Sequence, residues 1–403
     1  HLSLRRQRQM CIRDSDYCVE GVGDKANPAL RFLTSDGHFA EEPKLHKKEN
    51  LFFVHVKRKR PLPEELLAAL KTLPGVKWVR KAEPYCFVQH GDPLFRSAEE
   101  AIALAERLKI SLGEIGIRYE AQLLGLSEEA VLAQMDQRLS IMESAVKQGL
   151  SGKLASMHFL GPTAHKIFAA EEEGRLIGKG LHTRAACRAL AAMHVNCSMG
   201  VVCAAPTAGS AGVIPGVVVS LLEDCKADRD KVIRSLFAAG AVGVIIADRA
   251  TFAAEVAGCQ VEIGAATAMA ASGVVDFAGG SAKQAFDAAA CSFQNTMGSV
   301  CDLVQGVVEI PCHTRNALGA ASAIVCADLL LGGYENPIPF DETVDAVYAV
   351  GKMLPAELRV TALGGLAQTP TAKSLKLRKT AVSYTHLRAH ETRHDLVCRL
   401  LLE

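Results

Sequence analysis

Long, weakly charged stretches rich in Ala, Gly and Val make up most of the chain beyond Gly161, and no other feature limits the possible folds as strongly. Side chains this small let helices pack closely, and glycine suits the points where two backbones approach each other. Hydrophobic residues form 49% of the chain and charged residues only 22%, which excludes disorder over most of its length. The pattern predicts a mainly α protein with a large, tightly packed helical domain.

The chain before this region is more mixed in composition and more highly charged. Two β-prone runs, at 51–56 and 76–88, lie on either side of a helical pattern at 63–73 that has a proline near its start. These signals predict a small α+β unit over residues 16–92, whose role the sequence does not reveal. The linker Gly91-Asp92-Pro93 leads into the helical domain, which is expected over residues 93–382.

Both ends of the chain differ from its body. Residues 1–15 contain four arginines, lack an initiating Met and show neither helical nor strand periodicity, and residues 383–403 are crowded with histidine and arginine. We interpret both segments as a non-native leader and tail, with a natural basic tail as the alternative. Cys11 and Cys398 are therefore left out of the candidate ligands.

Helix-start signals follow the linker. Ser97 with Glu100, and Ser111 with Glu114, match the capping box, in which both side chains satisfy free amides at a helix start. Ser127 opens a longer helix that is expected to run to about residue 148, with Gly149 as its left-handed stop. Apolar residues three and four apart give this helix a core-facing stripe: Val131, Leu132, Met135, Leu139, Met142 and Val146.

Residues 196–222 contain no charged side chain and are numerous enough to cross a bilayer. Two prolines, several glycines and the hydroxyl side chains of Ser198, Thr207 and Ser210 interrupt the run, and it has no aromatic belt. We therefore expect a buried helix broken by a polar loop. A membrane permease for a small amino acid remains the alternative from a different functional class.

Net charge and cysteine content limit the possible binding partners and the cellular compartment. The formal net charge of +1 argues against general binding of nucleic acid or of an anionic membrane. Thirteen cysteines, an odd number without a signal peptide or a disulfide-type repeat, favour a reducing cytoplasm. Thiols serve there as metal ligands or as small core residues.

Three of the cysteines lie in segments that recur below. Cys259 stands in GCQVEIG, while Cys301 and Cys312 bracket a segment that ends in Pro311. Their spacings are far longer than the local pairs of zinc or ferredoxin motifs, and cysteine is often simply buried, so spacing alone leaves metal binding and core packing both open. The cysteines inside small-residue helical runs are expected to be packing residues: Cys187, Cys197, Cys203, Cys225, Cys291 and Cys326.

Several motifs, taken together in their order along the chain, are more specific than any one of them alone. They are NCSMG at 196–200, continuing to the Pro- and Gly-containing segment 205–215; Gly258-Cys259 followed by Glu-Ile-Gly at 262–264; and the block from Cys301 through Cys312 to Arg315-Asn316. In this wording and order the chain resembles the alpha chain, or catalytic domain, of the iron-sulfur-dependent L-serine dehydratases, also called L-serine ammonia-lyases. The resemblance covers roughly residues 96–375.

The resemblance implies a cofactor and a reaction. Cys259, Cys301 and Cys312 would hold a [4Fe-4S] cluster, and three thiolates leave one iron open to act as a Lewis acid. Coordination of the serine hydroxyl there makes hydroxide a better leaving group and the α-proton more acidic. Loss of water then yields pyruvate and ammonia, with threonine or cysteine as slower substrates. A cysteine desulfidase-like lyase, which expels sulfide by the same logic, is the alternative within the enzymes.

The resemblance also implies a missing part. Single-chain relatives carry a beta domain with a Ser-Ser-His-Thr type motif, and no such motif occurs between residues 16 and 92. A separate beta subunit or a homo-oligomer is therefore the expected source of further active-site groups.

The segment 205–215 suggests how the substrate binds. Its Pro and Gly residues make a loop whose bare backbone can approach a ligand, ahead of a helix start that favours an anion. A simple break between two buried helices is the alternative. With the resemblance added, the expected substrate-binding residues are Asn196, Ser198, Thr207, Gly209, Ser210, Gly212 and Arg315. Arg315 would either bind a carboxylate or offset negative charge at the cluster.

Candidates for proton transfer are less well defined. Glu262 and Glu309 lie near predicted ligands in apolar runs, where burial would raise the pKa of a carboxyl group and suit a proton carrier. Alternatively, each accepts hydrogen bonds from backbone amides. Four histidines are candidates for the base, none distinguished by spacing: His165, His182, His194 and His313. Asn316 is expected to cap a helix over 317–331.

Overall fold

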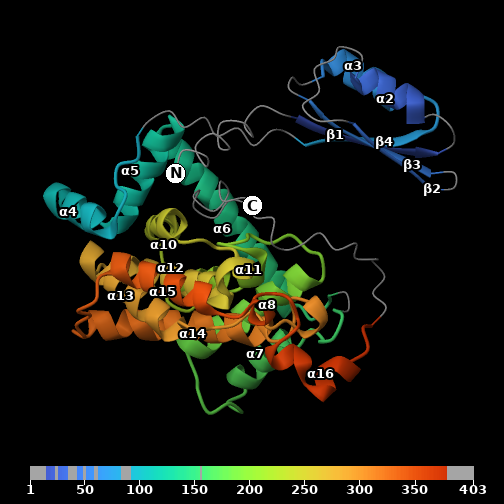
Figure 1. Cartoon of the computed structure of the whole chain (residues 1–403). Coiled ribbons are helices and arrows are strands. Elements are labelled where there is room, and N and C mark those ends of the chain that lie inside the picture. Colours follow the sequence, from blue (N-terminus) through green and yellow to red (C-terminus); the bar gives the residue numbers. More distant parts are fainter. Residues whose placement is uncertain are drawn as a thin grey trace. The chain divides into compact units, whose positions relative to one another are not determined.

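The computed structural model describes residues 15–22, 26–34, 43–48, 51–58, 62–82, 92–154 and 157–378 (Figure 1). The chain divides into two compact units, residues 1–89 and 90–403. The interpretations given for residues 1–14 and 383–403, including Cys11 and Cys398, lie outside the described residues.

The first unit is a four-stranded antiparallel sheet with two helices, which confirms the predicted α+β character. The elements follow in the order β1 (Ser15–Val22), α2 (Ala26–Thr34), β2 (Lys44–Lys48), β3 (Leu51–Arg58), α3 (Glu64–Lys71) and β4 (Val76–Ala82). The strand order β2-β3-β1-β4 is that of a split β-α-β arrangement. Alternate residues of β3, Phe52, Val54 and Val56, pack with Leu33 and Leu70 of the two helices.

The second unit is built from helices, so the predicted mainly α fold class is confirmed. Its longer helices are α4 (Ala98–Leu108), α5 (Leu112–Leu124), α6 (Glu128–Leu150), α7 (Ala164–Glu172), α8 (Leu181–Cys197), α9 (Val213–Glu223), α10 (Arg229–Arg249), α12 (Ile263–Phe277), α13 (Ala282–Thr296), α14 (Cys312–Leu331) and α15 (Phe340–Met353). Short elements join them: α11 (Ala254–Ala257), α16 (Pro370–Ser374) and the 3-10 turns η1 (Ala208–Ser210), η2 (Cys259–Val261), η3 (Val304–Gly306), η4 (Ala356–Leu358) and η5 (Gly365–Gln368).

Helix α12 forms the centre of this unit and lies among α10, α13 and α14 (Figure 1). Fourteen of its residues in succession, from Ile263 to Asp276, are buried, which requires the small side chains that the sequence provides. Close packing is visible at Gly273, where an added Cβ atom would lie 3.0 Å from the carbonyl oxygen of Ser235 on α10. The Ala- and Gly-rich composition thus explains how a helix can be surrounded on every side.

The predicted helix starts are largely confirmed. Ser111 and Glu114 form the complete capping box at α5, and the Ser127 hydroxyl accepts a hydrogen bond from the amide of Ala130 at α6. At α4 only half of the box is present, because the Glu100 carboxylate accepts from the amide of Arg96 and not from that of Ser97. The amide of Arg96, in the preceding turn, thus takes the place of the Ser97 amide at the Glu100 carboxylate.

The prediction that Gly149 stops α6 is wrong. The helix continues to Leu150, and the glycine is buried within it. An added Cβ atom would lie only 2.1 Å from the carbonyl oxygen of Ala191, so glycine is needed here for the close approach of α8. The positive φ, +69°, occurs three residues later at Gly152.

The charge-free run at 196–222 does not form one helix. It contains the end of α8, an irregular segment with η1, and most of α9, which spans only Val213–Glu223. Among the described residues one helix, α14, is long and apolar enough to cross a membrane by length and composition, and α9 is too short. That helix packs against α8, α12 and α13.

Candidate active site

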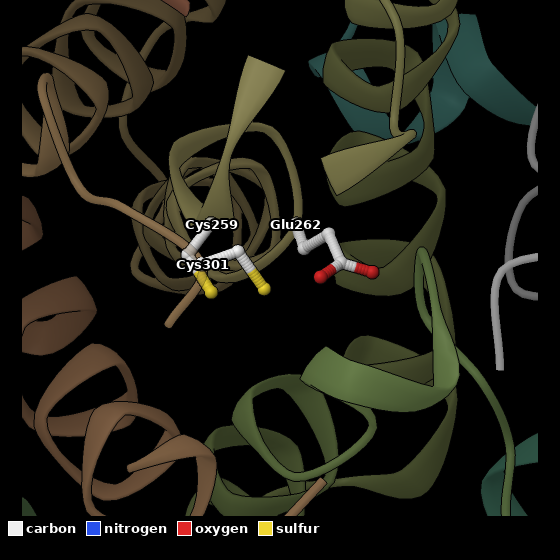
Figure 2. A group of neighbouring side chains, drawn as sticks. All are labelled: Cys259, Glu262 and Cys301. Atoms are coloured by element: carbon white, nitrogen blue, oxygen red, sulfur yellow. The ribbon is translucent and has the colours of Figure 1, made fainter. Parts of the chain in front are cut away.

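Cys259, Glu262 and Cys301 form a buried group at the N-terminal end of α12. Their ligand atoms lie within 4.8 Å of one another, and Figure 2 shows both sulfurs and the carboxylate directed into the same space. Cys259 opens η2 directly after Gly258, whose φ of +77° favours glycine. An added Cβ atom at Gly258 would also lie 2.7 Å from the carbonyl oxygen of Ser299, so the loop that carries Cys301 packs closely there.

The two thiols are paired unequally. A hydrogen bond from the Cys301 thiol, opposed by burial and assisted by Arg315, lowers the pKa of Cys259. The same hydrogen bond, together with burial, raises the pKa of Cys301. Of the two thiols, Cys259 is therefore the one whose thiolate form is favoured.

Arg315 supports that thiolate. Its Nη1 lies 3.7 Å from Cys259 Sγ and donates to the carbonyl oxygen of Val300 at 2.8 Å, while Nη2 donates to Asp302 Oδ1 at 3.0 Å. Burial acts to lower the pKa of Arg315, but the negative charges of Cys259 and Asp302 raise it overall. Of the two roles predicted for this residue, offsetting negative charge at the sulfurs is the one that its contacts match.

Cys312 is the first residue of α14 and is buried. Burial raises its pKa well above the ordinary value, and the negative charges of Cys259 and Glu262 raise it further. It therefore lies close enough to these groups to sense their charge, although it is outside the group that meets within 4.8 Å. The structure brings two of the three predicted ligands together and places the third nearby.

Glu262 is buried. Burial raises the pKa of its carboxyl group well above the ordinary value, the charge of Cys259 raises it further, and a hydrogen bond from the Thr207 hydroxyl lowers it in part. The protonated form of this carboxyl group is therefore more strongly favoured than that of an exposed glutamate. Gly209 borders the same carboxyl group, and an added Cβ atom there would lie 3.3 Å from Glu262 Oε2.

Two asparagines hold the loop that contains Thr207, Gly209 and Gly212. Asn196 Nδ2 donates to the carbonyl oxygen of Ala208 at 2.8 Å. Asn316 Oδ1 accepts from the amide of Gly212 at 3.0 Å, and Asn316 Nδ2 donates to the carbonyl oxygen of Gly209 at 2.8 Å. The loop is therefore fixed to α8 and to α14.

Within this loop the hydroxyls of Thr207 and Ser210 lie 3.1 Å apart and close the turn of η1. Ser198 is half-buried at the C-terminal end of α8. The prediction that Asn316 caps a helix beginning at residue 317 is wrong, because α14 begins at Cys312 and Asn316 lies inside it. Its side chain instead joins the helix to the loop.

The histidines do not enter the thiol group, which contains no histidine among the described residues. His313 Nε2 lies 3.3 Å from Cys197 Sγ, and its ring is 5.2 Å from that of His194. Burial lowers the pKa of His313 to about 3 and that of His194 to about 4, with a further contribution from His194 to the first and from His165 to the second. Both rings are neutral at pH 7. His165 is half-buried, and His182 lies 3.7 Å from Asp328.

Glu309 uses its carboxylate to hold the backbone. Oε1 accepts from the amide of His158 at 2.6 Å, and Oε2 accepts from the amides of Phe159 and Leu160 at 2.9 and 2.8 Å. These contacts match the second role considered for it, that of a hydrogen-bond acceptor. Its position does not bring it into the group around Cys259.

Sequence reasoning did not single out Asp302. The residue is buried beside Cys301, and its two oxygens accept from Arg315 and from the amide of Leu366. An acidic residue directly after a candidate ligand, in an otherwise apolar run, is the signal that could have identified it.

The chain is similar to known proteins over most of the helical unit. The family described as serine dehydratase alpha chain matches residues 90–367. "Probable L-serine dehydratase, alpha chain" of Bacillus subtilis (strain 168) is 40% identical over 283 residues, which cover 70% of this chain and 94% of that protein. "L-serine dehydratase, alpha chain" of Peptoniphilus asaccharolyticus is 34% identical over 284 residues, 70% of this chain and 97% of that protein. A further relative, "Probable L-serine dehydratase, alpha chain" of Latilactobacillus sakei, is 46% identical over 190 residues, 47% of this chain and 91% of that protein.

Proposed function

The chain belongs to the serine dehydratase alpha chain family, and from that premise we propose that it converts L-serine to pyruvate and ammonia with a [4Fe-4S] cluster bound by Cys259, Cys301 and Cys312. The observation that carries the proposal is the buried group of Cys259, Cys301 and Glu262, with Arg315 at its edge. It lies within the residues that match the family.

The donor set fits such a cluster. Thiolates are soft ligands that select iron-sulfur clusters over hard cations, and the hydrogen bond from Cys301 together with Arg315 lowers the pKa of the Cys259 thiol. Cys312 supplies a third thiol in the same buried region. A cluster held by three thiolates supplies a Lewis acid, which polarises the leaving hydroxyl group and makes the α-proton more acidic.

The chain also offers a proton donor for the leaving group and a loop that can position the substrate. The raised pKa of Glu262 favours a proton on its carboxyl group, beside Cys259, and we assign this group the protonation of the departing hydroxide. Gly209 brings bare backbone, with no side chain, against that carboxyl group, and we assign this side of it to the substrate. Asn196 and Asn316 hold the loop in position, so the approach to Glu262 is preorganised.

The base that removes the α-proton is expected from a partner subunit. The two buried histidines His194 and His313 lie outside the thiol group; their rings face each other, and His313 contacts Cys197. Relatives named as alpha chains make a separate beta subunit the natural candidate. We propose a cytoplasmic enzyme, because its function depends on thiols that stay reduced.

The test is a pyruvate assay under anaerobic conditions. The iron-loaded 403-residue chain, alone and with a beta subunit of the family, is offered L-serine, L-threonine and L-cysteine. Pyruvate from L-serine at a higher kcat/KM than from the other two supports the proposal. Sulfide release from L-cysteine as the dominant reaction would favour the desulfidase alternative, and no turnover of any substrate by the iron-loaded complex would refute both.

A further inference from the structure

The segment 355–376, here called the strap, fixes the backbone of Cys301. The amide of Cys301 donates to the carbonyl oxygen of Leu358, and the amide of Val360 donates to the carbonyl oxygen of Cys301, both at 2.8 Å. These two bonds form a short parallel bridge between the strap and the loop after α13. A residue proposed to bind the cofactor is therefore held by a segment about 55 to 60 positions later in the chain.

The strap also holds the neighbouring Asp302. The amide of Leu366 donates to Asp302 Oδ2 at 2.8 Å. Gly365, with a φ of +60°, makes this approach possible, because an added Cβ atom there would lie 2.7 Å from the Asp302 side chain. Only 8% of the Asp302 side chain is exposed, so water does not readily replace these bonds.

Asp302 also contacts Arg315, whose guanidinium group faces the Cys259 sulfur. Its second oxygen, Oδ1, accepts from Arg315 Nη2 at 3.0 Å, and Nη1 of the same guanidinium group faces Cys259 Sγ at 3.7 Å. Because the guanidinium group is planar and rigid, holding one nitrogen fixes the direction of the other. A continuous path of polar contacts thus connects the amide of Leu366 to the sulfur of Cys259.

We propose that Asp302 is a positioning residue which, held by the strap, directs Arg315 at the Cys259 sulfur and thereby determines how firmly the site retains its metal. The inference rests on the proposed function for the identity of that metal. Groups that orient the ligands of a metal typically change metal affinity by about 10- to 100-fold when they are replaced. The competing role for Arg315, binding the substrate carboxylate, predicts an effect on KM and none on metal retention.

The first test replaces the carboxylate. The rate of iron transfer to a chelator is measured on the anaerobically loaded 403-residue chain and is followed by the loss of visible absorbance. Asp302→Asn is expected to release iron about 10- to 100-fold faster than the wild type. The matched control is Asp345→Asn, which breaks an arginine-aspartate pair of the same chemistry with Arg249, between α10 and α15. It should release iron at the wild-type rate.

The second test acts on the strap and keeps the inference testable if Asp302→Asn does not fold. Leu366→Pro removes the amide that donates to Asp302, whereas Leu366→Ala keeps it and removes only a half-exposed side chain. Faster iron release from the proline variant, with the alanine variant unchanged, supports the proposal.

Three results are decisive against it. Equal release rates from iron-loaded wild type, Asp302→Asn and Leu366→Pro overturn the inference alone. A raised KM for L-serine in Asp302→Asn with an unchanged release rate also overturns it, and assigns Arg315 to the substrate. A wild-type chain that takes up no iron overturns the proposed function and this inference with it.

Discussion

Replacement of Asn316 by alanine tests how the substrate loop is held. The change removes the partner of the Gly212 amide and of the Gly209 carbonyl oxygen, both in buried hydrogen bonds. A buried polar group left without a partner costs about 1 to 3 kcal/mol, so the two together lower the free energy of unfolding by about 2 to 6 kcal/mol. The third contact, with the carbonyl oxygen of Cys312, adds little, because that oxygen also accepts from the helical amide four residues later.

Urea unfolding of the anaerobically purified protein measures this loss. Asn196→Ala is the matched control, since it removes a single, partly buried bond to the same loop and should cost about 0.5 to 1.5 kcal/mol. In a steady-state assay, Asn316→Ala should also raise the KM for L-serine while its iron content stays unchanged. The freed loop no longer keeps Gly209 in position beside Glu262.

The reasoning is refuted if Asn316→Ala is no less stable than Asn196→Ala. Asn316→Asp provides a second comparison, because it keeps an acceptor for the Gly212 amide and turns a carboxylate oxygen toward two carbonyl groups. It should therefore also be less stable than the wild type. An unchanged KM in Asn316→Ala would separate the loop from substrate binding.

Two further predictions concern stability. Burial raises the pKa of Asp276 to about 6 from an ordinary 3.8, so the wild type loses about 3 kcal/mol of stability as the pH rises from about 4 to about 6. Asp276→Asn lacks this loss. Denaturant unfolding at several pH values should therefore show the free energy of unfolding of the variant rising relative to that of the wild type across that window. If the two free energies change with pH in parallel, the assignment is contradicted. Gly149→Ala should lower the free energy of unfolding by about 1 to 3 kcal/mol or more, because its Cβ atom would overlap the carbonyl oxygen of Ala191. Gly161→Ala, where an added Cβ atom meets nothing within 4 Å, should leave stability unchanged, and equal losses in both variants would exclude the packing explanation.

Local signals predicted those parts of the fold that local physics decides. The start of α5 is an example, because the Ser111 capping box needs only residues within one helical turn. By contrast, β1 was missed. It lies between β3 and β4, and its stability comes from pairing with strands that are distant in the sequence. Gly149 shows the same limit, since a glycine needed for close approach cannot be told from one needed for positive φ without knowing which helix lies opposite.

The candidate site divides in the same way. The order of the motifs identified Cys259, Cys301 and Glu262. The fold brings them together, although α12 and α13 separate Glu262 from Cys301 in the sequence. The role of Asp302 could not be predicted, because it depends on the amide of Leu366, 64 positions later. Sequence motifs therefore indicated the chemistry, while the contacts that support it follow from tertiary packing.

Cluster content is the most direct test of the proposed cofactor. Iron and acid-labile sulfide are measured per chain in anaerobically reconstituted wild type, in Cys259→Ser, Cys301→Ser and Cys312→Ser, and in Cys291→Ser as a buried-thiol control on α13. We predict about four iron and four sulfide per chain in the wild type and in Cys291→Ser, with most of both lost in the other three variants. A full complement in Cys312→Ser, or none in the wild type, would contradict a cluster held by these three thiolates.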